Sequence, residues 1–354
     1  MRACHIPGDP TGVSCDGSYT VNEPIGAQSW FPSNNYATDK ATFDTSVTVP
    51  DTHVALGVGE LEGRTDNGDG TRTWRWAEDD PTATYLTSAT VGLFDYSNDS
   101  SFTEDLTGRN IPIYAAIDSA KNSTAKTTFA TRMSEIPGII NFFSDRFGPY
   151  PFDSTGAVTD IAPDVGYALE NQTKPHYATT LESNGVGFSP GTQVHELAHQ
   201  WFGDSVSAAT WQEIWFNEGW ATWSEIAFNA GTLDEAALET FFDDTYAAPD
   251  EEWTTPPADL GGPENLFAGF PVYDRPAAML EGYRQIVGND AFFAFARGLM
   301  EDHGYGTISI DEFIAEALDA SGLSGTSRAT LEDYFDQWLR GDTKPTLTPD
   351  DFPA

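Results

Sequence analysis

The sequence predicts an α+β protein in which a β-rich front part precedes a small sheet and a mostly helical body. Three observations lead to this prediction. Up to about Ile117, apolar and polar positions alternate with a period of two, as they do in antiparallel strands. The polar stretch IDSAKNSTAKTT follows, and after Gly191 nearly every segment has the period of an amphipathic helix. We therefore expect two domains in the 354 residues, divided after residue 118.

The front part, residues 1–118, is predicted to be an antiparallel β domain. Strands are expected where β-branched and aromatic residues alternate or cluster, in ATFDTSVTVP, TRTWRWAE and TATYLTSATVGLF. The segment RTDNGDGTRT holds Asn67-Gly68 and Asp69-Gly70, which are pairs typical of a hairpin turn. DNGDG also begins like a calcium-binding loop, but the later carboxylates and the closing glutamate of such a loop are missing. The pattern therefore favours the turn.

The second part, residues 119–354, changes to helical periodicity. Residues 124–147 form a helical pattern that is interrupted at Pro137-Gly138 and ended by FGPYPF. Two strands are expected in TGAVTDIA and HYATTLES. The remaining helices are predicted in VHELAHQWFG, NEGWATWSEIAF, LDEAALETFFDDTY, YDRPAAMLEGYRQIVG, DAFFAFARGLMED, SIDEFIAEALDA and RATLEDYFDQWLR.

The composition is that of a folded and strongly acidic protein. Apolar residues make up 39% and aromatic residues 13%, which indicates a packed core. The 17 Lys and Arg against 55 Asp and Glu give a net charge of −38, so nucleic acid is not an expected partner. Such a surface suits either an enzyme that works in high salt or an acidic secreted protein. No run of about 18 apolar residues occurs, so no transmembrane segment is expected.

Two cysteines, Cys4 and Cys15, lie close together in the segment CHIPGDPTGVSC. Their spacing suits a small disulfide-closed loop, and two reduced thiols are the alternative. No CxxC pair exists, so these residues do not predict a zinc site. The acidic surface and the disulfide together favour an extracellular or secreted location.

The segment VHELAHQWFG places two histidines and a glutamate in an otherwise apolar helical run. Residues four apart lie one turn above each other on a helix, so His195 and His199 project from the same face and can share one metal ion. Glu196 stands beside the first histidine, where metallopeptidases keep a general base. The alternative is two ordinary helical histidines, one of them buried and hydrogen-bonded.

A catalytic zinc ion takes three protein ligands and keeps one position for water, so a third ligand is expected. Glu218 follows His199 after 18 intervening residues, in WFNEGWATW. Asn217 is a good N-cap residue and would place Glu218 in the first turn of a second helix. Glu213 and Glu225 lie nearby, and spacing alone does not choose among the three glutamates.

The motif HELAH, the spacing of 18 residues and the segment NEG-W-A together resemble the gluzincin aminopeptidases of the aminopeptidase N family. The resemblance selects Glu218 as the third ligand and implies a single Zn²⁺. It implies a thermolysin-like catalytic domain for residues 119–354, preceded by a partial N-terminal β domain. It extends from about Asn22 to about Thr346, with EPIGAQSWFPSNNYATDKATFDTSVTVP similar to the strand region before the catalytic domain of this family.

Further segments resemble parts of this family in the same order. YALEN, residues 167–171, stands where the family has its G-A-M-E-N exopeptidase motif and keeps the Ala, Glu and Asn. The resemblance implies that Glu170 binds the α-ammonium group of the substrate and that Asn171 belongs to the same substrate site. VYDRPAAMLEGYRQIVG is similar to the segment with a catalytic tyrosine, which would be Tyr273; a buried core tyrosine is the alternative. Glu23 falls where the family has a residue lining the N-terminal end of the cleft.

The run GFSPG fits the Gly-x-Ser-x-Gly pattern of serine hydrolases, with Ser189 as the nucleophile. That motif needs a buried strand before it, and the preceding YATTLESNGVG is too polar and too rich in glycine. Ser189 followed by Pro190 is typical of a helix start, with serine at the N-cap and proline at the first helical position. We therefore expect the helix with the two histidines to begin here.

The sequence thus predicts a hydrolase, namely a zinc-dependent metalloprotease that removes the N-terminal residue from peptides with a free N-terminus. His195, His199 and Glu218 would hold the zinc, and Glu196 would act as the general base. Tyr273 would help to stabilise the oxyanion. One alternative is a gluzincin endopeptidase or another zinc hydrolase, because the same site serves several reactions. The other is a peptide-binding relative without catalysis.

Overall fold

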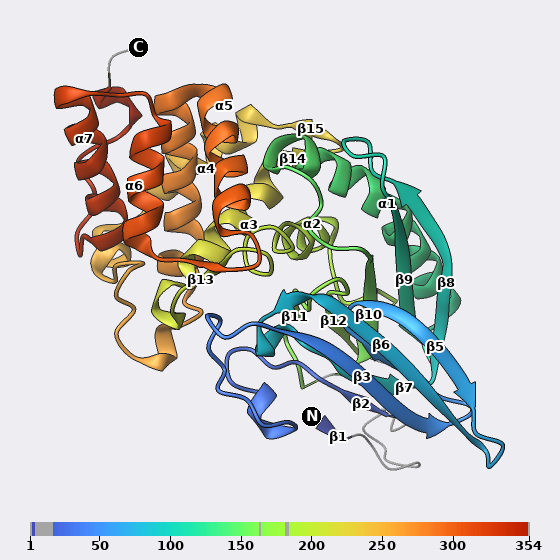
Figure 1. Ribbon diagram of the computed structural model, residues 1–354. Coiled ribbons are helices and arrows are strands. Elements are labelled where there is room, and N and C mark those ends of the chain that lie inside the picture. Colours follow the sequence, from blue (N-terminus) through green and yellow to red (C-terminus); the bar gives the residue numbers. More distant parts are fainter. Residues whose placement is uncertain (1, 4–16, 163, 181–183, 353–354) are drawn as a thin grey trace. The chain divides into compact units, whose positions relative to one another are not determined.

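The computed structural model describes residues 2–3, 17–162, 164–180 and 184–352 (Figure 1). The chain forms two compact units, one of Met1–Asn141 with Tyr150–Gln200 and one of Phe142–Pro149 with Trp201–Ala354. The predicted division after residue 118 concerns domains rather than these units and stays a prediction. Cys4 and Cys15 lie outside the described residues, so the disulfide also stays a prediction.

The described part of the first unit contains three β-sheets. An antiparallel sheet has the order β3 (Ala41–Pro50), β6 (Thr71–Thr82), β5 (Glu60–Asp66). A second has the order β1 (Arg2–Ala3), β2 (Ser18–Tyr19), β7 (Ala89–Gly92), β4 (Val54–Gly57). The third has the order β11 (Ala168–Leu169), β12 (His176–Thr179), β10 (Thr155–Ile161), β9 (Asn110–Asp118), β8 (Phe94–Thr103). In it, β10 runs parallel to both neighbours, which confirms the strands predicted in TGAVTDIA and HYATTLES.

The hairpin predicted around DNGDG is confirmed. β5 and β6 pair with Asp66 opposite Arg72, and Gly68 and Gly70 in the connecting turn have φ values of 75° and 83°. These are left-handed conformations that glycine adopts without a steric penalty. The Asp69 carboxylate accepts hydrogen bonds from the backbone and hydroxyl of Thr71, so this acidic side chain stabilises the turn itself.

Trp74 and Trp76 show how the alternating pattern of the front strands becomes a core. Both side chains are buried, whereas Arg75 between them is exposed, as expected for a strand with one covered face. The indole of Trp76 donates to the carbonyl of Ala55, so its one polar atom is satisfied. Leu56 packs in the same cluster.

One predicted strand is only partly correct. In TATYLTSATVGLF, β7 covers only the end of the segment, and Thr84–Leu86 instead form a short 3₁₀ helix, η2. Thr84, Tyr85 and Leu86 are all buried, which a strand with alternating faces does not achieve when only one face is covered. This turn determines the direction of the Tyr85 side chain.

Helix α1 (Ser123–Phe147) differs from the expected interrupted helix, because it continues through Pro137. Proline lacks the N–H that would bond to the preceding turn, which disfavours it inside a helix. Here Ile136, Ile139 and Ile140 around it are all buried. The burial of these side chains outweighs the lost hydrogen bond. The predicted interruption of the helix at Pro137-Gly138 is therefore wrong.

The second unit is mostly helical, as predicted (Figure 1). Its helices are α3 (Trp215–Ala227), α4 (Glu235–Tyr246), α5 (Arg275–His303), α6 (Ile310–Ala320) and α7 (Gly325–Phe335). Two short sheets pair β13 (Ser207–Ala208) with β16 (Thr307–Ile308) and β14 (Phe228–Asn229) with β15 (Thr232–Leu233). α5 breaks at Gly288, where φ is 79° and ψ is 163°, between the two helices that the sequence predicts there.

Short helical turns complete both units. Those described are η1 (Ala27–Ser29), η3 (Trp211–Glu213), η4 (Asp250–Thr254), η5 (Pro263–Asn265), η6 (Phe270–Asp274), η7 (Asp336–Arg340) and η8 (Pro349–Asp351), of which η6 and η7 are π-helical. None of the described helices combines the length and the apolar stretch needed to cross a membrane.

Candidate active site

The two histidines of the HELAH motif lie at the end of helix α2 (Pro190–Ala198), as the sequence predicts. Ser189 is the N-cap, and its hydroxyl oxygen accepts the N–H of Thr192 at 2.9 Å. This role as a cap, with Pro190 at the first turn, supports the helix start over a serine nucleophile. The N–H of His199 donates to the carbonyl of His195 at 3.2 Å, and the two imidazole ring centres lie 4.8 Å apart.

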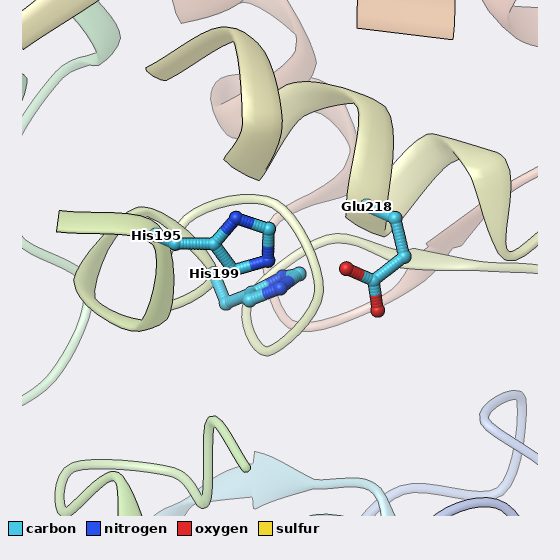
Figure 2. Close-up of side chains that lie close together, drawn as sticks. All are labelled: His195, His199 and Glu218. Atoms are coloured by element: carbon cyan, nitrogen blue, oxygen red, sulfur yellow. The ribbon is translucent and has the colours of Figure 1, made fainter. Parts of the chain in front are cut away.

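Glu218 completes a metal-binding set with the two histidines. One ligand atom from each of His195, His199 and Glu218 lies within 4.8 Å of the others. Figure 2 shows both imidazoles and the carboxylate facing one shared space. His199 and Glu218 are buried and His195 is partly exposed.

The two competing glutamates belong to neither metal-binding set found among the described residues. The Glu213 carboxylate accepts the N–H of Ile310 at 3.0 Å and the Thr210 hydroxyl at 3.1 Å. It therefore satisfies the start of helix α6, where backbone N–H groups lack helical partners. Glu225 lies further along α3. Spacing could not make this distinction, but the resemblance did.

The expected role of Asn217 as a helix N-cap is wrong. Helix α3 begins two residues earlier, at Trp215, and its N-cap is Ile214, whose side chain makes no capping bond. The Asn217 side chain is buried within the helix and accepts the N–H of Ala208 at 3.0 Å. A tertiary hydrogen bond has taken the place of the local capping bond. Glu218 nevertheless lies in the first turn of α3, where the helix dipole favours a carboxylate.

Aromatic packing and one close approach fix helix α3 within the second unit. Trp220 stacks on Phe202 with ring centres 4.1 Å apart, and both are fully buried. Gly219, directly after Glu218, lies so close to α5 that an added Cβ would come within 2.8 Å of Pro276 Cβ. The proline ring is rigid, so only glycine allows this contact.

We expect Gly219→Ala to destabilise the protein by about 1–3 kcal/mol, because the methyl group overpacks a rigid contact. The displaced helix should also move Glu218 and weaken zinc binding. Chemical denaturation and zinc retention against a competing chelator would measure the two effects. Gly298→Ala in α5 is the matched control, because its Cβ would meet no atom within 4 Å and should keep both stability and zinc. Equal behaviour of the two variants would contradict this account of Gly219.

Glu170 and Asn171 lie in a buried loop directly after β11. The hydroxyl of Tyr85 donates to the Glu170 carboxylate at 3.0 Å. The Asn171 amide donates to the carbonyls of Leu86 at 2.9 Å and Thr87 at 3.2 Å. The structure therefore places Asn171 as an anchor of the loop, and its predicted contact with substrate stays a prediction.

Glu170, Glu196 and His199 form a second close set, in which one ligand atom of each lies within 4.8 Å of the others. All three side chains are buried. The predicted amine-binding carboxylate and the predicted general base thus both lie close to one predicted metal ligand. Helix α2, which holds Glu196, packs against β11, which directly precedes Glu170.

The charge of the predicted general base acts on two buried tyrosines, Tyr19 and Tyr177. Burial, with the charge of Glu196 adding to it, raises the pKa of Tyr177 well above its usual range. Burial is also the main cause of the raised pKa of Tyr19, and the charges of Asp160, Tyr167 and Glu196 raise it further. Both hydroxyls therefore stay protonated near Glu196 and can donate hydrogen bonds. Tyr177 is held in place by stacking on Phe188, with ring centres 3.7 Å apart.

The two remaining predicted residues lie in irregular segments. Tyr273 belongs to the π-helical turn η6, is partly buried, and packs beside Val272 and Leu260 in an apolar cluster. Helix α3, with Glu218, packs against this turn. Glu23 is partly buried in the turn between β2 and η1. Their catalytic and substrate-binding roles stay predictions.

Sequence reasoning missed two residues that build the site. Tyr85 bonds to Glu170 across 85 positions of the chain, and its segment gave only a strand signal. Gln200 follows His199 within the quoted motif, and its side chain bonds to the Glu170 loop. The only available signal was its position beside a metal ligand. Such contacts depend on tertiary structure, so local patterns do not predict them.

The sheets of the first unit, the helices of the second unit and the set of two histidines and one glutamate are features that metallopeptidases combine. Residues 191–338 match the peptidase family M1 domain, and residues 14–86 match the peptidase M1 N-terminal domain. The two matches together cover more than half of the chain, which belongs to peptidase family M1. The predicted family is confirmed.

Known aminopeptidases are similar along most of this chain. Aminopeptidase M1-C of Oryza sativa subsp. japonica is 25% identical over 355 residues, which are 95% of this chain and 38% of that protein. Aminopeptidase N of Streptomyces lividans is 26% identical over 336 residues, 89% of this chain and 38% of that protein. Glutamyl aminopeptidase of Bos taurus is 23% identical over 349 residues, 94% of this chain and 35% of that protein. The chain thus spans less than two fifths of these relatives.

Solved structures share the fold. The M1 zinc metallopeptidase of Deinococcus radiodurans aligns with a TM-score of 0.79 and 25% identity, over 95% of this chain and 72% of that one. A mutant of that enzyme, bound to a Tyr-Ser-Ala substrate, aligns with a TM-score of 0.79 and 24% identity, over 98% of this chain and 76% of that one. The predicted α+β fold class is confirmed.

The residues of the site fit the zinc ion that the family implies. Two imidazoles and one carboxylate are a donor set of catalytic zinc sites, which use three protein ligands and leave one position open. The ligand atoms converge on one point from the end of α2 and the first turn of α3. The predicted zinc cofactor is confirmed by the family and by this set.

Proposed function

We propose that this chain is a zinc-dependent aminopeptidase, which hydrolyses the first peptide bond of peptides with a free N-terminus. The observation that supports this most directly is the close set of Glu170, Glu196 and His199. In this set the buried Glu170 carboxylate lies within 4.8 Å of the carboxylate of Glu196, which we propose as the general base. The kinship with aminopeptidases supports the same activity.

Glu170 would determine which peptide bond of the substrate reaches Glu196. A buried carboxylate attracts the α-ammonium group of a peptide, because a charge-assisted hydrogen bond is strong away from water. The bond from the Tyr85 hydroxyl to Glu170 keeps the carboxylate in one orientation. A peptide anchored by its first nitrogen presents only its first peptide bond to Glu196.

Glu196 would act as the base and then as the acid. It takes a proton from the attacking water and afterwards gives it to the nitrogen of the leaving peptide. Zinc held by His195, His199 and Glu218 would supply a Lewis acid that lowers the pKa of water and polarises the carbonyl. The Tyr273 hydroxyl would donate a hydrogen bond to the oxygen that becomes negative, a contribution typically worth about 2.7–4 kcal/mol.

The proposed substrates are peptides. The Tyr-Ser-Ala substrate bound in the Deinococcus radiodurans enzyme mutant supports this class. We also propose that residues 1–118 and 119–354 form the two domains, which the family matches over 14–86 and 191–338 support. A third proposal is an extracellular location, which the net charge of −38 supports.

Metal removal and restoration test the proposal. The purified chain should release amino acids one at a time from the N-terminus of an unmodified peptide, as followed by mass spectrometry. Treatment with a chelator should abolish the release, and one equivalent of zinc should restore it. Cleavage that persists without metal would contradict a zinc enzyme, and internal cuts would indicate an endopeptidase. Bound zinc without any cleavage would indicate a peptide-binding relative.

A further inference from the structure

Gln200 connects the end of the metal-binding helix to the loop that holds Glu170. Its side chain is fully buried, one residue after His199. The amide Nε2 donates to the backbone carbonyl of Glu170 at 3.0 Å, and Oε1 accepts the N–H of Thr173 at 2.8 Å. The Tyr150 hydroxyl also reaches Oε1, at 3.4 Å. One side chain therefore binds both ends of the short loop from Glu170 to Thr173.

The loop needs such support, because Thr173 is in an unfavourable backbone conformation. Its φ is 66°, and a β-branched residue rarely adopts this left-handed region because of steric strain. Thr173 is buried, and its hydroxyl oxygen accepts hydrogen bonds from Gly59 N–H and Lys174 Nζ, each at 3.0 Å. Its own N–H is satisfied by Gln200. Surrounding bonds thus maintain a conformation that Thr173 would not adopt alone.

Two rigid elements therefore hold the loop. On one side, the Asn171 amide donates hydrogen bonds to the carbonyls of Leu86 and Thr87. The Tyr85 hydroxyl also donates to the Glu170 carboxylate, so the start of the loop is bound to η2 and the residue after it. The Gln200 amide ties the loop to the end of α2. The Gln200 contact reaches the metal-binding motif, because His199 is the preceding residue.

We propose that Gln200 is a positioning residue that sets the place of Glu170 relative to His199, and thereby the selectivity for a free α-amine. The inference rests on the proposed function, in which Glu170 binds that amine. An amide is suited to this task, because it offers a donor to the Glu170 carbonyl and an acceptor to the Thr173 N–H from one planar group. A methionine of similar length offers neither.

The test measures binding rather than turnover, in a zinc-loaded Glu196→Gln parent protein. Titration calorimetry compares a tripeptide in its free and N-acetylated forms, and the zinc content and melting temperature of each variant are recorded. In Gln200→Met we expect the dissociation constant of the free tripeptide to rise at least tenfold. The acetylated form should change less than twofold, and zinc should stay at one per chain. Gln200→Asn, which retains an amide but is too short to reach both groups, should shift selectivity in the same direction by a smaller factor.

Gln193→Met is the matched control. Gln193 lies on α2 and is buried like Gln200, but its amide donates to the Arg132 carbonyl at 2.7 Å instead of to the Glu170 loop. The same substitution there should lower the melting temperature and leave the preference for the free tripeptide intact. If Gln193→Met and Gln200→Met reduce the preference equally, Gln200 has only a structural role.

The outcomes separate the inference from the proposed function. If the parent protein binds both tripeptides equally, the amine-anchor role of Glu170 fails. If the parent prefers the free form and both Gln200→Met and Gln200→Asn keep the full preference, only the positioning role of Gln200 is overturned. Loss of zinc from Gln200→Met with selectivity retained in Gln200→Asn would overturn it as well.

Discussion

Glu196→Gln is expected to keep one zinc per chain and to lose peptide hydrolysis by about 10²–10⁴-fold, the usual contribution of a general acid–base group. Glutamine fills the same space as Glu196, so the buried surroundings and the neighbouring His195 and His199 should stay in place. An amide cannot accept the proton of the attacking water. The loss should therefore appear in kcat, while the affinity for peptide changes little.

The measurement is steady-state hydrolysis of an unmodified peptide, together with the zinc content of the same preparation. Glu225→Gln on helix α3 is a matched control, because it makes the same change at a glutamate outside both metal-binding sets found in the described residues. The control should retain zinc and turnover. Turnover in Glu196→Gln equal to that of the control would remove the general-base role.

Glu170→Gln is expected to weaken binding of peptides with a free N-terminus by about 10- to 100-fold. This corresponds to the loss of a charge-assisted hydrogen bond worth about 1.5–3 kcal/mol. Because the amide keeps the shape of the side chain, the loop and the nearby His199 should not move. The effect should appear mainly in KM, since in the proposed function Glu170 contacts the bound amine rather than the reacting carbonyl.

Tyr85→Phe should weaken the same proposed interaction of Glu170 with the substrate amine to a smaller extent. It leaves the charge of Glu170 intact and removes only the hydroxyl that donates to it at 3.0 Å. We therefore expect a smaller rise in the KM of the free peptide than in Glu170→Gln, and neither change should alter the dissociation constant of the N-acetylated peptide. An equal loss of affinity for the free and the acetylated peptide would show that Glu170 does not bind the amine.

The metal-binding motif was predictable because its geometry is local. The spacing of His195 and His199 places both on one face of any α-helix, and Ser189 with Pro190 marks the helix start. The choice of Glu218 is different, since it comes from another helix. Spacing left three glutamates open, and the choice rested on the resemblance until the structure brought the ligand atoms together.

Local rules failed where tertiary contacts outweigh them. Asn217 has a side chain suited to a helix cap, but the N–H of Ala208 is a better partner inside the folded chain. Pro137 ordinarily ends a helix, but the buried isoleucines around it keep α1 continuous. Both errors have the same cause, because local preferences of about 1–3 kcal/mol compete with burial and buried hydrogen bonds of similar size.

The residues that hold the Glu170 loop in place could not be predicted from the sequence alone. Tyr85 is 85 positions from Glu170 in the chain, and a 3₁₀ turn that the pattern did not predict directs it there. Gln200 stands within the motif, but its partners Glu170 and Thr173 lie about 30 positions earlier. The residues proposed to perform the chemistry therefore follow from motifs and from the family resemblance, whereas the residues that hold them in place follow only from the fold.

The central claim, that Glu170 limits cleavage to the first residue, is tested most directly by one mixture of two peptides. A peptide and its N-acetylated form, distinguished by isotope labels, are incubated with the zinc-loaded chain, and the products are read by mass spectrometry. The account predicts stepwise loss of N-terminal residues from the free peptide and no cleavage of the acetylated one. Equal cleavage of both peptides, or internal cuts in both, would contradict it.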